Sequence, residues 1–156
     1  MGVMPRHRVM IPLRWSDTDA YGHINNVLFL RLFEEARVQV LDDYLAADST
    51  GPRTALLVVR SEIEHQEPLL FRVAPVTVDL WVSRIGAADF DMDYQLLDPA
   101  SDEDGTGALY AQAQTTLVVF DQASAKPRRI TKEERARLEG WRDEPVRWRR
   151  RRPSPR

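Results

Sequence analysis

Hydrophobic and polar residues alternate at the start of the chain and again along its second half. Near the N-terminus, Val9, Ile11, Leu13 and Trp15 would share one face of a strand, with Arg8, Met10, Pro12 and Arg14 on the other. Residues 76–85 and 89–96 alternate in the same way. One apolar and one polar face is typical of antiparallel strands with one side in water. We therefore expect an N-terminal strand, further strands over residues 54–120, and a polar hairpin loop at 98–107.

A long helical pattern separates the first strand from the others. Between residues 26 and 45, apolar side chains recur every three or four positions, at Phe29, Leu32, Phe33, Ala36, Val40 and Tyr44. Asn25 or Asn26 is a suitable N-cap, and Arg31 and Glu35 can pair one turn apart. One long helix with an apolar face, packed on one antiparallel sheet, makes the predicted fold class α+β.

The chain of 156 residues suits a single domain followed by a tail. A short helix with a capping box is expected at 131–140. Residues 146–156 contain six arginines and no acid, so removing these charges from the net charge of −2 leaves −8 on the rest. We divide the chain into a folded domain, 1–142, and a basic C-terminal tail, 143–156, for which we expect poor order.

Composition excludes several function classes. There is no cysteine, so disulfides, thiolate nucleophiles and thiolate metal sites are ruled out. The three histidines, at positions 7, 23 and 65, have no ligand spacing, and we expect no metal site. No apolar run approaches the ~20 residues that cross a bilayer, and arginines interrupt any signal-peptide core, so we expect a cytoplasmic protein without membrane contact. The acidic body argues against nucleic-acid binding by the folded domain.

The most distinctive segment is Asp17-Thr18-Asp19-Ala20-Tyr21-Gly22-His23-Ile24-Asn25-Asn26, between the first strand and the long helix. A helix N-terminus offers free N–H groups and a positive dipole end, which favour developing negative charge. A carboxylate beside it can attack an electrophile or remove a proton. The same spacing also suits a structural role, in which the Asp19 carboxylate accepts backbone N–H groups in an Asx-turn.

With this motif in place, the chain resembles the 4-hydroxybenzoyl-CoA thioesterase branch of the hotdog fold over about residues 7–130. The other similar segments are Phe33-Glu34-Glu35-Ala36-Arg37, Glu62-Ile63-Glu64-His65 ending at Pro68, Trp81–Gly86 and Thr115–Asp121. The resemblance implies an antiparallel sheet wrapped around one long central helix, in homodimers or homotetramers with active sites between subunits. It also implies hydrolysis of acyl-CoA thioesters without metal or organic cofactor. An acyl carrier protein as the acyl donor, in place of CoA, stays an open alternative.

Residue by residue, the resemblance implies that Asp19 is the catalytic carboxylate, acting as nucleophile or as general base. It places the carbonyl-polarising backbone N–H at Asn26. His23 can orient Asp19, bind substrate or hold the loop, and we interpret Asp17 as a structural residue of the turn. A working carboxylate on the long helix, at Glu34 or Glu35, stays open.

Three further residues are candidates for substrate binding. Asn25 can position water or substrate but can also simply cap the helix, and we expect Gly22 to be needed for its backbone conformation. Arg84 can meet the phosphates of CoA. The Gly-His-x-Asn-Asn pattern lacks the aromatic residue that members acting on aromatic substrates carry at Asn26, which points to aliphatic or other acyl groups.

Two rival functions and the role of the tail also stay open. Hotdog hydratases use an Asp and a His separated by four residues, whereas three separate Asp19 from His23. A non-catalytic acyl-CoA-binding module would bind the same ligand without releasing a thiol. The basic tail can be a solubilising segment, contact nucleic acid or an anionic surface, or reach the CoA of a neighbouring subunit.

Overall fold

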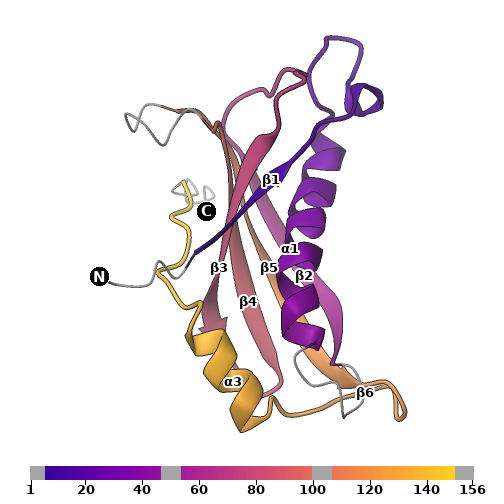
Figure 1. The fold of residues 1–156 in the computed structure, drawn as a ribbon, viewed down its shortest axis with the longest axis vertical. Coiled ribbons are helices and arrows are strands. Elements are labelled where there is room, and N and C mark those ends of the chain that lie inside the picture. Colours follow the sequence, from indigo (N-terminus) through magenta and orange to yellow (C-terminus); the bar gives the residue numbers. More distant parts are fainter. Residues whose placement is uncertain (1–5, 47–53, 100–106, 150–156) are drawn as a thin grey trace, which may run out of the picture.

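The computed structural model describes residues 6–46, 54–99 and 107–149, together with their side chains except those of 42–46. Its strands are β1 (His7–Ile11), β2 (Ala55–His65), β3 (Val76–Ile85), β4 (Asp89–Leu97), β5 (Leu109–Asp121) and β6 (Lys126–Pro127), and its α-helices are α1 (Phe29–Ala46) and α3 (Lys132–Glu139). The sheet runs in the order β1, β3, β4, β5, β2, with β6 paired to β5 (Figure 1). Every strand pair is antiparallel.

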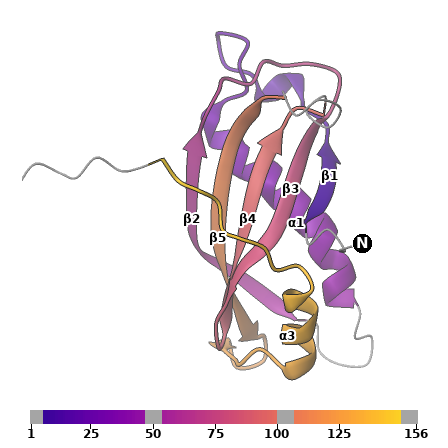
Figure 2. The ribbon, with the colours of Figure 1, turned by 90° about the vertical axis from the view of Figure 1, so that its left-hand side faces the viewer.

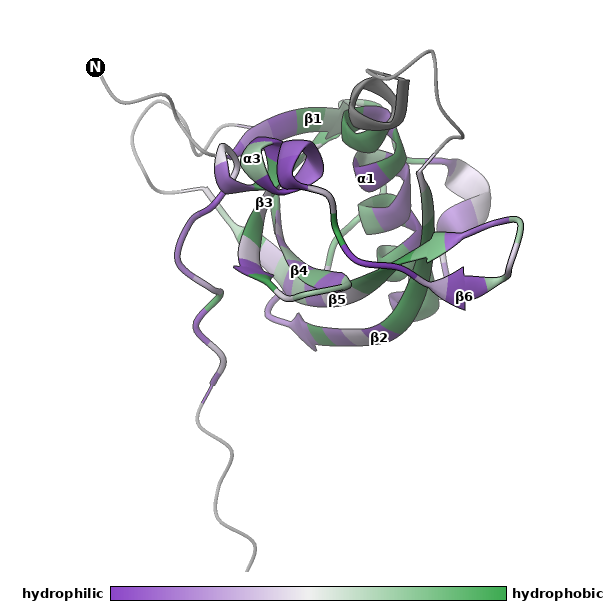
Figure 3. Ribbon diagram, turned by 90° about the horizontal axis from the view of Figure 1, so that it is seen from below, coloured by the Kyte–Doolittle hydropathy of each residue, from purple (hydrophilic) through white to green (hydrophobic). Residues whose placement is uncertain are grey.

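The core lies between α1 and the concave face of the sheet, which curves around the helix (Figure 3). Apolar side chains of α1 meet alternate residues of β3, β4 and β5, and the buried set includes Phe29, Leu32, Phe33, Ala36, Val78, Leu80, Met92, Tyr94, Leu96 and Ala113. The predicted α+β class, with an antiparallel sheet wrapped around one long helix, is confirmed.

The long helix begins close to the predicted position. Asn25 is the N-cap, since its side-chain oxygen accepts the Val27 N–H at 3.2 Å. One 3₁₀ turn, Asn26–Leu28, precedes α1. The predicted apolar face is buried from Phe29 to Ala36, while the polar Arg37 is buried as well and donates to the Tyr94 hydroxyl at 3.1 Å.

The first strand is shorter than its alternation suggests. β1 ends at Ile11, because the next residue, Pro12, has no N–H with which to continue the ladder to β3. Trp15 belongs to a 3₁₀ turn, Trp15–Asp17, and is 76% exposed, so the prediction that it shares one face of a strand with Ile11 is wrong.

The outer face of the sheet is not the wet surface that its polar residues suggested. Asp79, Trp81, Asp91 and Asp93 are buried there. The chain after α3 crosses this face, with α1 on the other side of the strands (Figure 2). Burial of so many carboxylates is possible because each accepts hydrogen bonds from arginine, hydroxyl, amide or backbone groups.

The C-terminal part also differs from expectation. The predicted short helix is present as α3, and its capping box joins Thr131 and Glu134 in both directions, at 3.2 and 2.9 Å. Poor order was expected from Asp143 onward, yet residues 143–149 contact the outer face of the sheet, and Val146 is buried. Residues 150–156 lie outside the described part of the chain, as do residues 100–106 of the predicted hairpin loop.

Candidate functional site

Asp17 ties the end of the first strand to the start of the helix. Its carboxylate is 2% exposed and pairs with Arg14, at 3.0 Å, and with Arg31 of α1. Its backbone carbonyl accepts the Asn25 N–H at 2.9 Å. Burial alone would raise the pKa of Asp17, but the hydrogen bonds and charges of the two arginines outweigh it and hold the pKa below its usual value. These contacts match the structural interpretation of Asp17.

Asp19 shapes the tight turn that follows. Its Oδ1 accepts the N–H of Tyr21 at 2.8 Å and that of His23 at 3.1 Å, the Asx-turn geometry left open by the sequence. Gly22 completes the turn with φ of +78°, the left-handed region that favours glycine, as predicted. Within the described residues the hydrogen bonds of the Asp19 carboxylate all go to Oδ1, which leaves Oδ2 available for chemistry.

The Asp19 side chain lines a cavity of about 300 Å³ between this turn and the segment that follows β2. The lining residues are Asp19, His23, Ile24, Asn26, His65, Gln66, Glu67 and Pro68. The structure therefore brings together the three residues predicted to be catalytic, Asp19, His23 and Asn26. Gly22 and Asn25 support this wall but do not line the cavity themselves.

The helix start leaves one backbone N–H for a ligand. Asn25 occupies two of the first amides, since its Oδ1 accepts the Val27 N–H and its carbonyl accepts the Leu28 N–H at 2.9 Å. Among residues 6–46, 54–99 and 107–149, no acceptor takes the N–H of Asn26. An unused amide at the positive end of a helix, on a cavity wall that also holds a carboxylate, suits stabilisation of an oxyanion.

The second wall of the cavity, residues 65–68, was not predicted as part of the site. His65 ends β2, and its ring packs edge-on against Phe29 with centroids 4.8 Å apart. Partial burial lowers the pKa of His65 and so favours the neutral form of the imidazole. The only sequence signal was the family-like segment ending at Pro68. Its approach to the turn depends on long-range backbone bonds, such as Ile24 N–H to the Leu69 carbonyl at 2.7 Å.

Arg84 lies elsewhere. It is the last residue but one of β3, and that end of the strand lies beside α3, away from the turn (Figure 1). Arg84 does not line the cavity. Its guanidinium binds Asp91 at 2.7 Å and Asp89 at 3.0 Å, and these bonds raise its pKa further above the usual range. The contacts make Arg84 a structural residue within this chain and do not support its predicted role in substrate binding.

The helix carboxylates also lie outside the cavity. Glu35 pairs with Arg31, as its spacing predicted, and Glu34 lies 3.7 Å from Arg37. Glu34 instead borders a second cavity of about 360 Å³, between α1 and β2, whose other walls are largely apolar and include Val38, Leu56 and Leu57. No contact in the described chain links either glutamate to Asp19.

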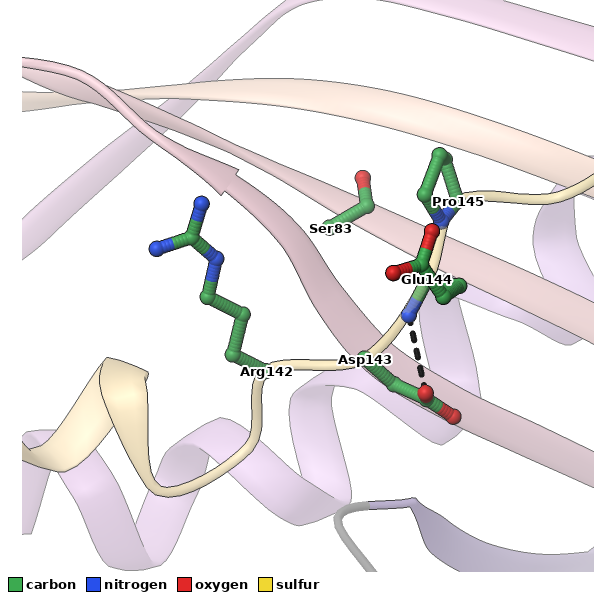
Figure 4. A pocket seen from close by; sticks show the side chains of 5 residues that line it. All are labelled: Ser83, Arg142, Asp143, Glu144 and Pro145. Carbon is green, nitrogen blue, oxygen red and sulfur yellow. Dashed lines mark hydrogen bonds between the residues drawn. The ribbon is translucent and has the colours of Figure 1, made fainter.

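A third cavity, of about 360 Å³, lies on the outer face beside the C-terminal segment (Figure 4). It is lined by Ser83, Arg142, Asp143, Glu144 and Pro145.

In the part of the chain that the structure describes, no three His, Cys, Asp or Glu side chains gather as a metal ion would require. Neither described α-helix combines the length and apolar character needed to cross a membrane.

Solved structures with this architecture come from several bacteria. The PA2801 protein of Pseudomonas aeruginosa, assigned as a thioesterase, is 30% identical, with a TM-score of 0.70 over 85% of this chain and 97% of that one. The PA5185 protein of the same species is 26% identical, with a TM-score of 0.74 over 90% and 94%. A Thermus thermophilus thioesterase in complex with coenzyme A and Zn is 24% identical, with a TM-score of 0.70 over 90% and 97%, and this likeness shows the fold alone.

A family comparison reaches the same result. No protein with a curated description matches the chain. The model of the Thioesterase-like superfamily matches residues 13–138, which include the turn, the long helix and the whole second wall of the cavity. Since this match covers most of the sequence and the sheet-and-helix architecture agrees, the chain belongs to the Thioesterase-like superfamily.

Proposed function

We propose that the protein hydrolyses acyl-CoA thioesters, with Asp19 as nucleophile or general base and the Asn26 N–H as the group that polarises the carbonyl. The observation that carries this proposal is that Asp19 and Asn26 line the same cavity, and that no acceptor among the described residues takes the Asn26 N–H. Superfamily membership supports thioester hydrolysis in general. A coenzyme A complex of the Thermus thermophilus thioesterase supports CoA as the thiol carrier.

The chemistry follows from the two groups. By one route Asp19 attacks the carbonyl carbon, the C–S bond breaks, the thiolate takes a proton from water, and a second water opens the mixed anhydride to release the acid. By the other, Asp19 takes a proton from water as that water adds to the carbonyl, and the tetrahedral intermediate then breaks its C–S bond to give the acid, while the proton held by Asp19 passes to the leaving thiolate. Both routes place negative charge on the carbonyl oxygen, where one backbone donor is typically worth ~3–4 kcal/mol.

We also propose that the active unit is a homodimer or homotetramer. β2 is an edge strand of the sheet, and its residues Leu57, Val58 and Val59 are exposed apolar side chains. An exposed, apolar edge strand favours pairing with another chain. Val38 of α1, also exposed, lies with Leu57 and Val58 around the second cavity, so a partner on β2 would cover that cavity as well. Leu57→Lys should then yield monomers in sedimentation velocity, whereas a monomeric parent protein would contradict the proposal.

A thiol-release assay over a panel of acyl-CoA esters of varied chain length tests the reaction. Hydrolysis should release free CoA with saturation kinetics for at least one acyl group. Crotonyl-CoA in the same panel distinguishes a hydratase, which would consume the double bond without releasing thiol. Stabilisation by CoA esters with no turnover of any of them would indicate a binding module and refute the hydrolase. Acyl groups presented on an acyl carrier protein complete the panel.

A further inference from the structure

The chain after α3 forms a strap across the outer face of the sheet. This C-terminal strap, Trp141–Arg149, begins beside β3, where the Val82 N–H donates to the Trp141 carbonyl and the Asp143 N–H to the Val82 carbonyl, both at 2.9 Å. The indole N–H of Trp81 then donates to the Glu144 carbonyl at 2.8 Å. Figure 4 shows residues 142–145 of the strap beside Ser83 of β3. The backbone and indole bonds anchor this part of the strap to β3.

A buried carboxylate holds the middle of the strap. Asp93 of β4 is 0% exposed, and its Oδ2 accepts the Val146 N–H at 2.7 Å. Its Oδ1 accepts the Ser83 hydroxyl at 2.6 Å and the Gln114 amide at 3.0 Å. Because releasing Val146 would leave a buried oxygen without a donor, the strap is held to one path across the sheet.

The far end of the strap meets the second wall of the candidate cavity. The Arg147 carbonyl accepts the Gln112 amide at 2.8 Å, and the Arg149 N–H donates to Glu64 at 3.0 Å. The Arg149 guanidinium donates to the side-chain oxygen of Gln66, one of the residues that line the cavity. The strap therefore carries exposed arginines from α3 to the rim of the site that contains Asp19.

The net negative charge of the rest of the chain would repel the phosphates of a CoA thioester, so a binding site for these phosphates requires unpaired cations. Residues 1–145 carry a net charge of −8, and the cavity itself presents Asp19 and Glu67. Arg14 and Arg31, the arginines that flank the turn, are both paired with Asp17. A CoA thioester carries several phosphate charges, separated from its sulfur by the pantetheine arm. Its phosphates would therefore lie at the rim, while the thioester lies in the cavity.

We propose that Arg147 and Arg149 bind the phosphate groups of the CoA thioester whose acyl end occupies the cavity. This inference rests on the proposed hydrolysis of acyl-CoA esters and adds the site for the anionic part of the substrate. Guanidinium groups suit this task, since their planar fork matches phosphate oxygens and they stay charged at every working pH. Three more arginines, at positions 150–152, follow Arg149 directly in the sequence.

The experiment compares Arg147→Ala and Arg149→Ala on a CoA thioester and on the pantetheine thioester of the same acyl group, which lacks the phosphates. Each substitution should raise KM for the CoA ester by about two- to fivefold, the range of an exposed charge pair, and leave KM for the pantetheine ester unchanged. The KM for the CoA ester should rise with ionic strength in the parent protein and less steeply in the double variant. Arg142→Ala is the matched control, because Arg142 belongs to the same strap but pairs with Glu139 beside α3.

The two arginines make the test specific. Arg149→Ala also breaks the bond to Gln66, whereas Arg147 has no side-chain bond among the described residues that its loss would break. An effect of Arg149→Ala alone, equal for both esters, would assign Arg149 to positioning Gln66 and overturn the proposal. Equal effects of Arg142→Ala and Arg147→Ala would overturn it as well.

Titration calorimetry with CoA alone distinguishes failure of the proposed phosphate site from failure of the proposed hydrolase function. The double variant should bind CoA about four- to twenty-fivefold more weakly than the parent protein, from two exposed pairs. Thiol release with unchanged CoA affinity in the double variant would refute the strap site and leave the hydrolase intact. Arginine-dependent CoA binding without any thiol release would refute the hydrolase and support the strap site.

Discussion

Replacing Asp19 by asparagine separates the structural role of this side chain from its chemical role. The Asn side chain keeps an Oδ1 that can accept the N–H groups of Tyr21 and His23, so the turn should persist. Its amide nitrogen then takes the place of Oδ2, the oxygen that the turn does not use. The variant therefore loses the nucleophile or base while it keeps the Asx-turn.

The expected change in kcat follows from the group that is removed and from the groups that the cavity keeps. Removing the general base or nucleophile should lower kcat at least ~100-fold, since such groups contribute about 10²–10⁴ in rate. A ~100-fold loss corresponds to about 2.7 kcal/mol of activation free energy. Asn26, which lines the cavity, is unchanged in this variant, so a residual rate above the uncatalysed reaction should remain if its N–H polarises the carbonyl as proposed. The free energy of unfolding should change by less than about 1 kcal/mol, because the hydrogen bonds of the turn are kept.

Thiol release with the best acyl-CoA ester, together with urea unfolding, measures both quantities on one preparation. Glu35→Gln is the matched control: it removes a nearby carboxylate that pairs with Arg31 and does not line the cavity. Full kcat in Asp19→Asn would refute the assignment of Asp19. A matching loss in Glu35→Gln, with Asp19→Asn active, would move the reaction to the helix carboxylates.

Three further predictions concern stability, and urea unfolding measures each. Asp17→Asn should cost about 2–3 kcal/mol, because two arginines lose the charge of their buried partner; a loss no larger than that of Asp19→Asn would contradict this. Gly22→Ala should cost about 1–2 kcal/mol from φ of +78° alone, since an added Cβ meets no atom within 4 Å; unchanged stability would contradict the strain. Partial burial lowers the pKa of His7 and His65, so the unfolded chain takes up protons first as pH falls below 6.5. The free energy of unfolding should therefore fall as the pH is lowered through 6.5 and stay level well above it, and a His7→Gln/His65→Gln variant that keeps the same slope would contradict the assignment.

Local patterns were sufficient for the elements that rest on neighbouring residues. The apolar spacing of Phe29, Leu32 and Phe33 predicted α1, because one face of a helix must be buried. The run from Asp17 to Asn26 predicted the turn, the left-handed glycine and the N-cap, since each depends on contacts only a few residues apart. Those contacts also placed Asp19 and Asn26 on one wall of the cavity.

Long-range contacts explain what the patterns missed. The alternation of β4 predicted that Asp91 and Asp93 face water, but Arg84 binds the first and the C-terminal strap covers the second. A polar strand face looks the same in sequence whether water or polar groups of the protein cover it. Similarly, the sequence does not show whether the charge of Arg84 is paired, because its acidic partners lie on the next strand and only the strand register brings them together.

The two walls of the candidate cavity are held to each other by backbone rather than by side chains. Ile24 donates its N–H to the Leu69 carbonyl at 2.7 Å, and Phe71 donates to the Gly22 carbonyl at 3.2 Å. Such bonds do not depend on which side chains line the space between the walls. The positions of the Asp19 carboxylate and the Asn26 N–H can therefore stay constant while the lining residues vary with the acyl group. For the proposed reaction, substitutions in the second wall should therefore change the space for the acyl group without displacing Asp19 or Asn26.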